Sequence, residues 1–432
     1  MSDSLGGVSR RAVLGGFATG VAVSWPHTGF ALDKVSVLLE ASGESLALSP
    51  GRPPSKVWRL AGRTPVVRVA QGASLDLSLT NDLAMPAALS GRGLVTPAPL
   101  LVQPAIGPGG RANLPAAAPR AGTGLLDLRL LGDGAAAPIR PLPVIVEEKN
   151  GVHVDRDEVF LVEDFRLKAD GSAVAPGADA GDAEVVYTVN GQLQPDLALR
   201  ALARVRLRFI NGCYRAVIAI KITDLDAVRV VAIDSQPAEP FLARNGAVVL
   251  PPGGRTDVFI DMLAKAPLPV LLHDGAAARL IARLTLSDEP PLGGAPLPAA
   301  PPLPANGLPD KLDLRSAFRA ELALDGPDWR TPAKFDALAT PAAFQARAGR
   351  VVVLALVNKA TTSTVVHLHG QPFRLLDRLD DGWKPYWLDT LAVEPGQTQR
   401  IAFLAEYPGR YLIEQVATDW AAPRLVRWYS VQ

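Results

Sequence analysis

The sequence predicts an all-β protein, and three observations support that fold class. Glycine and proline are frequent, at 38 and 39 of 432 residues, and both residue types favour turns. Apolar and polar side chains alternate with period two over residues 64–81, as they do in a half-buried strand. A continuous apolar run at 351–357 fits a further strand. Because a domain contains about 100 to 200 residues, the chain length predicts two to four domains.

The composition excludes several classes of function. The formal net charge is only +1, so the bulk electrostatics predict neither nucleic-acid binding nor a strongly acidic partner. No run of about 20 apolar residues occurs, so the sequence predicts no membrane span. Cys213 is the single cysteine, which rules out an intrachain disulfide. Because no histidine stands near it in the sequence, we expect a small buried hydrophobe there rather than a nucleophile.

The first 31 residues resemble a twin-arginine export signal. Ser9-Arg10-Arg11 precedes a mildly apolar stretch at 12–25, and a small-x-small pattern closes the segment at 29–31. This pattern predicts export of the folded protein to the periplasm. The mature chain would then start near Leu32 and would lack His27. The alternative is a disordered, mildly basic tail.

A pair of histidines is the most informative feature near the C-terminus. His367 and His369 stand two residues apart in an extended run, so both rings should leave one face of a strand and offer two imidazoles to one metal. Three motifs follow, Trp-Leu-Asp-Thr at 387–390, Val-Glu-Pro-Gly at 393–396 and Phe-Leu-Ala-Glu-Tyr-Pro-Gly at 403–409. In their order, these motifs and the histidine pair resemble the third domain of the multicopper oxidases.

The resemblance covers nearly the whole mature chain. Residues 64–81 resemble the opening of the family's first domain, and the segments at 189–192 and 250–258 resemble its middle domain. A stretch rich in Pro, Leu, Gly and Ala at 289–309 is typical of a semi-rigid connector. The resemblance implies three cupredoxin-like, plastocyanin-like domains, each a Greek-key β-sandwich. The predicted organisation is a signal at 1–31, domain 1 at 32–141, domain 2 at 142–288, a linker at 289–309 and domain 3 at 310–432.

Most of the copper ligands that the resemblance implies are missing. A blue-copper centre needs a thiolate beside two imidazoles, and Gln415 stands at the place of that thiolate. The mature chain keeps four histidines, of which His153 and His273 stand alone in the sequence. The full copper set therefore cannot be assembled, and we expect no cofactor. The residues at the aligned ligand positions are Ser90, Arg92, Asp127, Arg129, Thr364, Glu414, Gln415, Val416, Trp420 and Leu425.

Charged residues at these positions suggest what replaces the metal. By the resemblance, Arg92 and Asp127 stand at one copper of the binuclear pair, and Arg129, Glu414 and His369 stand at the other. We therefore predict two ion pairs, Arg92–Asp127 and Arg129–Glu414, in which guanidinium charge substitutes for the cation. Such a network would fix geometry more than it would add stability, because desolvation offsets most of the attraction.

Two functions remain after these observations. The first is a non-catalytic binding or scaffold protein with a protein partner in the periplasm. The sequence is similar to a copper-free branch of the family that is exported by the twin-arginine route and linked to cell division under stress. The alternative is a copper-dependent oxidoreductase with a weak residual site at His367 and His369, which otherwise form a structural pair. Trp383 and Tyr386 are candidate interface residues, whereas Trp387 is expected in the core.

Overall fold

The computed structural model describes residues 34–225, 227–262, 266–292, 297–377 and 382–432. The predicted export signal at 1–31, with His27, lies outside the described residues. The described residues all belong to one compact unit. Within the described ranges the secondary structure consists of 30 strands and three short 3-10 helices, so the predicted all-β class is confirmed. No helix in these ranges is long and apolar enough to cross a membrane.

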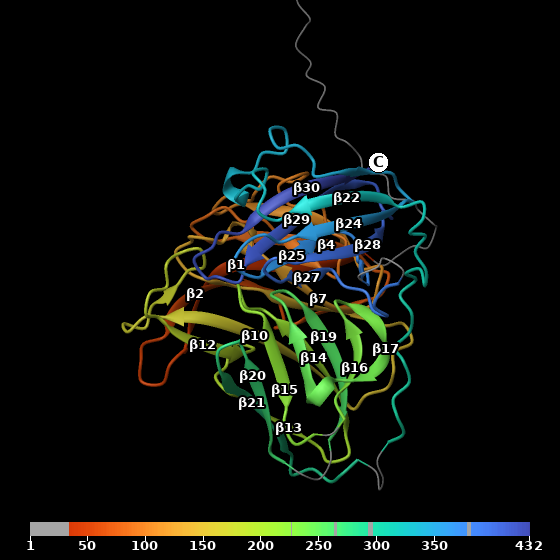
Figure 1. The fold of residues 1–432 in the computed structure, drawn as a ribbon. Coiled ribbons are helices and arrows are strands. Elements are labelled where there is room, and N and C mark those ends of the chain that lie inside the picture. The colour runs from red at the N-terminus through yellow and green to blue at the C-terminus, as the bar shows by residue number, and fades with distance from the viewer. Residues whose placement is uncertain (1–33, 226, 263–265, 293–296, 378–381) are drawn as a thin grey trace, which may run out of the picture. The chain divides into compact units, whose positions relative to one another are not determined.

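The strands fall into three consecutive groups, each with two sheets (Figure 1). In the first group the sheets have the orders β6-β4-β1-β2-β8 and β3-β9-β7-β5. Strand β4 buries Leu75, Leu77 and Leu79 on one face, as the alternation in the sequence predicts. The elements of this group are β1 (Lys34–Leu46), β2 (Ser55–Ala61), β3 (Val67–Ala70), β4 (Ser74–Asn81), β5 (Ser90–Arg92), β6 (Arg111–Ala117), β7 (Gly122–Asp127), η1 (Arg129–Leu131), β8 (Ile139–Arg140) and β9 (Leu142–Glu147).

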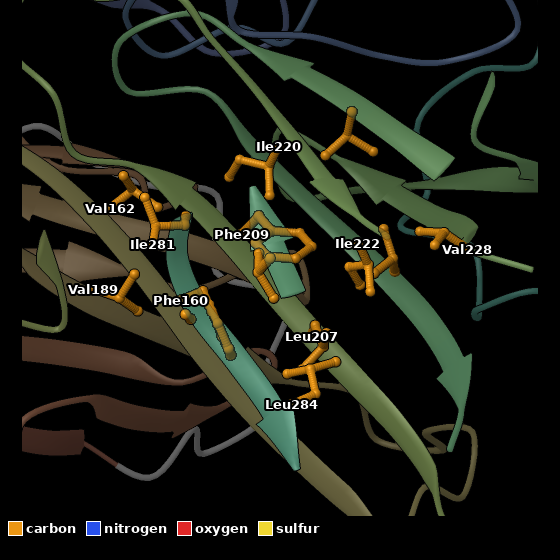
Figure 2. Packing of buried hydrophobic residues seen from close by; sticks show 14 of the residues in the cluster. Phe160, Val162, Val189, Leu207, Phe209, Ile220, Ile222, Val228, Ile281 and Leu284 are labelled. Atoms are coloured by element: carbon orange, nitrogen blue, oxygen red, sulfur yellow. The ribbon is translucent and has the colours of Figure 1, made fainter. Parts of the chain in front are cut away.

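The second group has sheets of order β11-β10-β14-β19-β16-β17, with β12 also on β10, and β13-β21-β20-β15-β18. Figure 2 shows the core between them, where Phe160 and Phe209 meet edge to face with ring centroids 5.5 Å apart. The elements are β10 (Arg156–Leu167), β11 (Ala173–Val174), β12 (Glu184–Val189), β13 (Asp196–Leu199), β14 (Arg204–Asn211), β15 (Ile218–Ile222), β16 (Arg229–Ile233), β17 (Gln236–Leu242), η2 (Arg244–Gly246), β18 (Ala247–Leu250), β19 (Arg255–Asp261), β20 (Leu268–His273) and β21 (Ala278–Leu286).

The third group has sheets of order β22-β24-β28-β26 and β23-β30-β29-β25-β27. The apolar run seen in the sequence is β24, and Val352, Leu354 and Leu356 on it are fully buried in the core between these sheets. The elements are β22 (Phe318–Ala323), η3 (Pro332–Lys334), β23 (Gln345–Ala346), β24 (Val351–Val357), β25 (Thr364–Leu368), β26 (Arg374–Leu375), β27 (Thr390–Val393), β28 (Thr398–Leu404), β29 (Gly409–Ala417) and β30 (Leu425–Val431).

Strand β9 and the connector both bear on the predicted domain boundaries. These boundaries remain predictions. Strand β9 starts at Leu142, beyond the predicted limit of domain 1, yet it pairs with β3 and β7 of the first group. The described part of the connector, 297–309, contains no strand. Its Asn306 side chain accepts from the Ala121 backbone N–H at 3.1 Å and donates to the Ser235 carbonyl at 3.2 Å. The connector is therefore fastened where the first two groups meet.

Candidate functional site

Strand β25 carries the two histidines of the candidate site. It pairs with β29 in a register that sets His367 opposite Glu414. His369 follows one residue beyond the end of β25. Both rings are buried, and their centroids lie 4.6 Å apart with an angle of 65° between the planes. The structure therefore brings the pair together as period-two geometry predicts.

His367 is held as a neutral ring in one tautomer. Its Nδ1 lies 3.0 Å from the Asp389 carbonyl oxygen, and the neighbouring Thr390 hydroxyl donates to the Asp389 carboxylate at 2.7 Å. Because a carbonyl oxygen only accepts, Nδ1 must carry the proton, and Nε2 then presents a lone pair. No protein group bonds this Nε2. Burial, together with the charge of Arg92, lowers the pKa of His367 to about 4.

Glu414 is the anion at the centre of the site. Its Oε1 lies 2.5 Å from His369 Nε2, and its Oε2 lies 2.6 Å from Arg424 Nη1 and 3.9 Å from Arg92 Nη2. Burial alone would raise the pKa of this carboxyl group. The attraction of His369, Arg424 and Arg92 outweighs burial and holds the pKa well below its ordinary value. Glu414 is therefore ionised and shared by three nitrogen-bearing side chains.

The first group of strands supplies the other half of the charge cluster. Arg92 at the end of β5 has Nη1 3.5 Å from Asp127 Oδ2, which is the predicted Arg92–Asp127 pair. Arg129 in η1 turns back onto the same carboxylate, with Nη2 2.6 Å from Asp127 Oδ2. Ser90 donates its hydroxyl to the Asp127 carbonyl at 3.4 Å. Asp127, at the end of β7, thus binds two guanidinium groups beside the sheet that contains β5 and β7.

The predicted Arg129–Glu414 pair does not form: Arg129 pairs with Asp127, and Glu414 pairs with Arg424. Arg129 stands only two residues after Asp127, and the tight η1 turn directs its guanidinium to that carboxylate and to the Gly212 carbonyl at 2.7 Å. Glu414 instead pairs with Arg424, whose Nη1 lies 2.6 Å from Glu414 Oε2. The sequence reasoning missed Arg424, although it directly precedes the aligned axial position Leu425. The antiparallel pairing of β29 with β30 sets Leu425 opposite Gln415, which brings Arg424 to the site.

Two residues at the aligned blue-copper positions make hydrogen bonds to backbone carbonyls. Gln415 donates from Nε2 to the Leu324 carbonyl at 2.6 Å. Trp420 donates from its indole to the Ala175 carbonyl at 3.1 Å and packs edge to face on Tyr214, so it docks the third group of strands on the second. The remaining aligned positions, Thr364, Val416 and Leu425, lie on β25, β29 and β30.

A small cavity lies inside the cluster. The space open to the centre of a water molecule is about 10 Å³, which is room for about one water. Arg92, Arg129, His367, Glu414 and Arg424 are among the residues that line it. The thiol of Cys213 lines it too, and burial raises the pKa of that thiol well above its ordinary value, so it stays protonated.

These side chains do not fit a copper ion. The Nε2 atom of His369 is engaged by Glu414, so of the two Nε2 atoms only that of His367 lacks a protein partner. Three guanidinium groups line the same cavity and would repel a divalent cation. Within the described ranges, no group of three or more His, Cys, Asp or Glu side chains is arranged to hold a metal.

A second buried charge cluster adjoins the first through His367. Arg255 makes two contacts with the Asp389 carboxylate, at 2.8 and 2.6 Å, and lies 3.5 Å from Asp234. Burial and the charge of Asp389 raise the pKa of Asp234 to about 6, whereas Arg255 and His367 hold that of Asp389 well below its ordinary value against the effect of burial. This cluster ties the second group of strands to the third. Sequence reasoning recognised these residues only as parts of frame motifs.

Of the aromatic residues Trp383, Tyr386 and Trp387, near β26, Trp387 lies in the core as predicted. Trp387 is buried, and the Arg374 guanidinium lies 4.7 Å from its ring centroid. Trp383 and Tyr386 are half-buried, with Trp383 5.8 Å from the same guanidinium. Their role as an interface stays a prediction.

Comparison with known proteins places the chain by fold. Residues 308–429 match the family model described as multicopper oxidase. The chain is 30% identical over 259 residues to "Cell division protein FtsP" of Pectobacterium atrosepticum, and 30% identical over 250 residues to the protein of that name from Sodalis glossinidius. These matches cover 55% and 52% of this chain and 52% and 50% of the relatives, so the chain spans about half the length of the curated relatives it matches.

Solved structures resemble the chain over a greater length. A multi-copper oxidase from Pseudomonas thermotolerans superposes with a TM-score of 0.79 at 23% identity, covering 93% of this chain and 100% of that one. Lac15 from a marine microbial metagenome superposes with a TM-score of 0.75 at 23% identity, covering 92% and 100%. The chain therefore has the multicopper oxidase fold with its cupredoxin-like sheets, and the match to the family model is confined to residues 308–429.

Proposed function

We propose that this chain is a copper-free protein on a multicopper oxidase frame that acts in the periplasm as a binding or scaffold protein, in a process related to cell division. The observation that carries the proposal is the guanidinium cluster of Arg92, Arg129 and Arg424 beside Glu414, at the place where the family resemblance implies copper. In this proposal the buried positive charge of the side chains takes over the structural role of metal ions.

The energetics of the cluster support this proposal. A buried charge costs several kcal/mol in lost hydration unless opposite charges and hydrogen bonds compensate it. Arg92, Asp127, Arg129, Glu414 and Arg424 compensate one another through contacts of 2.6 to 3.9 Å. A divalent ion placed among the three guanidinium groups would break these contacts and would meet like charge at close range. Electron entry through a blue-copper centre would also require a thiolate, and Gln415 has none.

The names of the relatives support the second part of the proposal. Both curated relatives are called cell division proteins. We extend that role to this chain, together with export by the twin-arginine route, the three-domain organisation predicted from the sequence and a periplasmic protein partner. Fold by itself does not fix function, so these parts need direct tests.

Copper loading tests the absence of metal chemistry. Purified mature protein is incubated with copper, desalted, and examined for bound metal, visible absorption and oxygen consumption with a phenolic substrate. A copper-loaded multicopper oxidase treated in the same way serves as the positive control. We expect less than one tightly bound copper per chain, no blue colour and no turnover. Stoichiometric copper with oxidase activity would overturn the proposal.

The alternative function is a copper-dependent oxidoreductase that uses a residual site at His367 and His369. The lone pair on His367 Nε2, which has no protein partner, is the observation that favours it. If this alternative holds, His367→Ala and His369→Ala will each remove the bound metal and the activity together. If the pair is structural, the two variants will change the unfolding midpoint and leave the metal content unchanged.

The binding role has its own test. Crosslinking in live cells, followed by affinity capture of the tagged protein, should recover a specific periplasmic partner. Trp383→Ala and Tyr386→Ala probe the candidate interface, and Trp58→Ala, a half-buried residue of the first group, serves as the control. Capture of no protein that is absent from an untagged control would count against a scaffold role.

A further inference from the structure

Three buried nitrogen atoms around the cavity lack a protein partner. They are Arg92 Nε, Arg424 Nε and His367 Nε2. Their side chains are at least nine-tenths buried, and all three line the cavity that has room for about one water. A Cβ placed on Gly253, another lining residue, would lie 2.7 Å from Arg92 Nε, which shows that this nitrogen faces the open side of the glycine. Buried polar atoms of this kind are normally satisfied.

The charge of the cluster argues against a metal cation in the cavity. Three guanidinium groups, those of Arg92, Arg129 and Arg424, face two carboxylates, those of Asp127 and Glu414, which leaves one net positive charge. Both oxygens of Glu414 are already engaged. A cation would meet repulsion and would gain no free carboxylate oxygen.

The tautomer of His367 argues against a simple anion such as a halide. Its Nδ1 side faces Asp389 and Thr390, so the proton sits there and the lone pair of Nε2 points away from them. A halide carries no hydrogen to donate, and it would set its charge against that lone pair. Arg92 Nε and Arg424 Nε, in contrast, are donors and need an acceptor. The occupant must therefore donate to one partner and accept from others.

We propose that the cavity is a binding site for one neutral, water-sized molecule that both donates and accepts hydrogen bonds, and that this molecule is water. It donates to His367 Nε2 and accepts from Arg92 Nε and Arg424 Nε. This arrangement gives three hydrogen bonds, the number that a buried water typically makes. Gln415 also lines the cavity, and its Oε1 is buried without a protein partner. This oxygen is left out because the Gln415 side chain leaves the opposite face of β29 from Glu414 and its Nε2 donates to the Leu324 carbonyl at 2.6 Å. The site holds whether or not the chain acts in cell division.

Crystallography of the wild-type full-length mature protein tests this site. Three crystals are compared, one without additive, one soaked in sodium bromide and one soaked in zinc chloride, with anomalous maps for the last two. We expect one peak of water density within hydrogen-bonding distance of His367 Nε2, and no anomalous signal in the cavity. A bromide peak would refute the neutral occupant, a zinc peak would refute the exclusion of cations, and an absence of density would refute the site itself.

Nitrogen NMR of histidine-labelled protein at neutral pH gives an independent readout. His367 should show a protonated Nδ1 and an unprotonated Nε2 whose shift is displaced by a hydrogen bond. His273, which is exposed at the end of β20, is the internal control: its Nδ1 accepts from the Gly275 backbone N–H at 3.0 Å, so it should show the opposite tautomer, with an unprotonated Nδ1 and a protonated Nε2. A proton on Nε2 of His367 would overturn the assignment, because that nitrogen could then bind an anion. Because bound copper would appear in the metal analysis described above, failure of this site and failure of the proposed function can be told apart.

Discussion

Replacement of Glu414 by Gln is the sharpest test of the charge cluster. Glutamine keeps the shape of the side chain but removes the one carboxylate that Arg424, Arg92 and His369 share at 2.6, 3.9 and 2.5 Å. The cluster would then hold three guanidinium groups against the single carboxylate of Asp127. Glu414 is only 3% exposed, so solvent cannot compensate for the loss. Removal of one partner from a buried ion pair costs about 3 to 5 kcal/mol, and we expect a loss in that range.

Urea denaturation followed by tryptophan fluorescence measures this loss as a lower midpoint at an unchanged slope. Glu158→Gln is the matched control, because its pair with Arg156 is exposed and should contribute no more than about 1 kcal/mol. The double variant Glu414→Gln with Arg424→Gln removes one charge of each sign and should recover part of the stability. A loss below about 1 kcal/mol in the single variant, or additive losses in the double variant, would refute the reasoning.

Three further predictions concern the same region. Because burial lowers the pKa of His367 to about 4, the unfolded chain binds a proton below pH 6.5 that the folded chain does not. The stability advantage of wild type over His367→Gln should therefore shrink by about 3 kcal/mol as the pH falls from 6.5 to 4, measured by urea titration at each pH, and the titration of Asp234 cancels in this difference. Gly253→Ala should lower the melting temperature, because its Cβ would lie 2.7 Å from Arg92 Nε at a backbone φ of +81°. A melting curve that matches wild type would contradict that contact. Cys213 should not react with a thiol reagent until the chain unfolds, and rapid labelling of the native protein would count against its burial.

The fold was predictable because its signals are local or repeated along the chain. Alternation of period two marks β4, and the apolar run marks β24. The spacing of His367 and His369 alone puts both rings on one face of a strand. Each of these inferences needs only the chain's own geometry over a few residues.

The partners in the charge cluster were harder to predict, because a guanidinium can reach several carboxylates. Alignment placed Arg92 and Asp127 correctly as neighbours, since both stand on paired strands β5 and β7. It failed for Arg129, because the η1 turn, which the sequence did not reveal, directs that side chain back to Asp127. Arg424 could have been found by balancing the buried charges. Because Arg129 pairs with Asp127, Glu414 needs another cation, and Arg424 is the arginine next to an aligned position.

The amino-acid sequence by itself determined which chemistry is missing, because five histidines and a single cysteine limit what any fold of the chain can bind. Tertiary structure alone decided what replaced that chemistry. The strand pairings bring Arg92, Arg424 and His367 from distant parts of the chain around one water-sized cavity. The energy of a buried charge depends on neighbours within a few ångströms, and those neighbours are set by packing rather than by order along the chain.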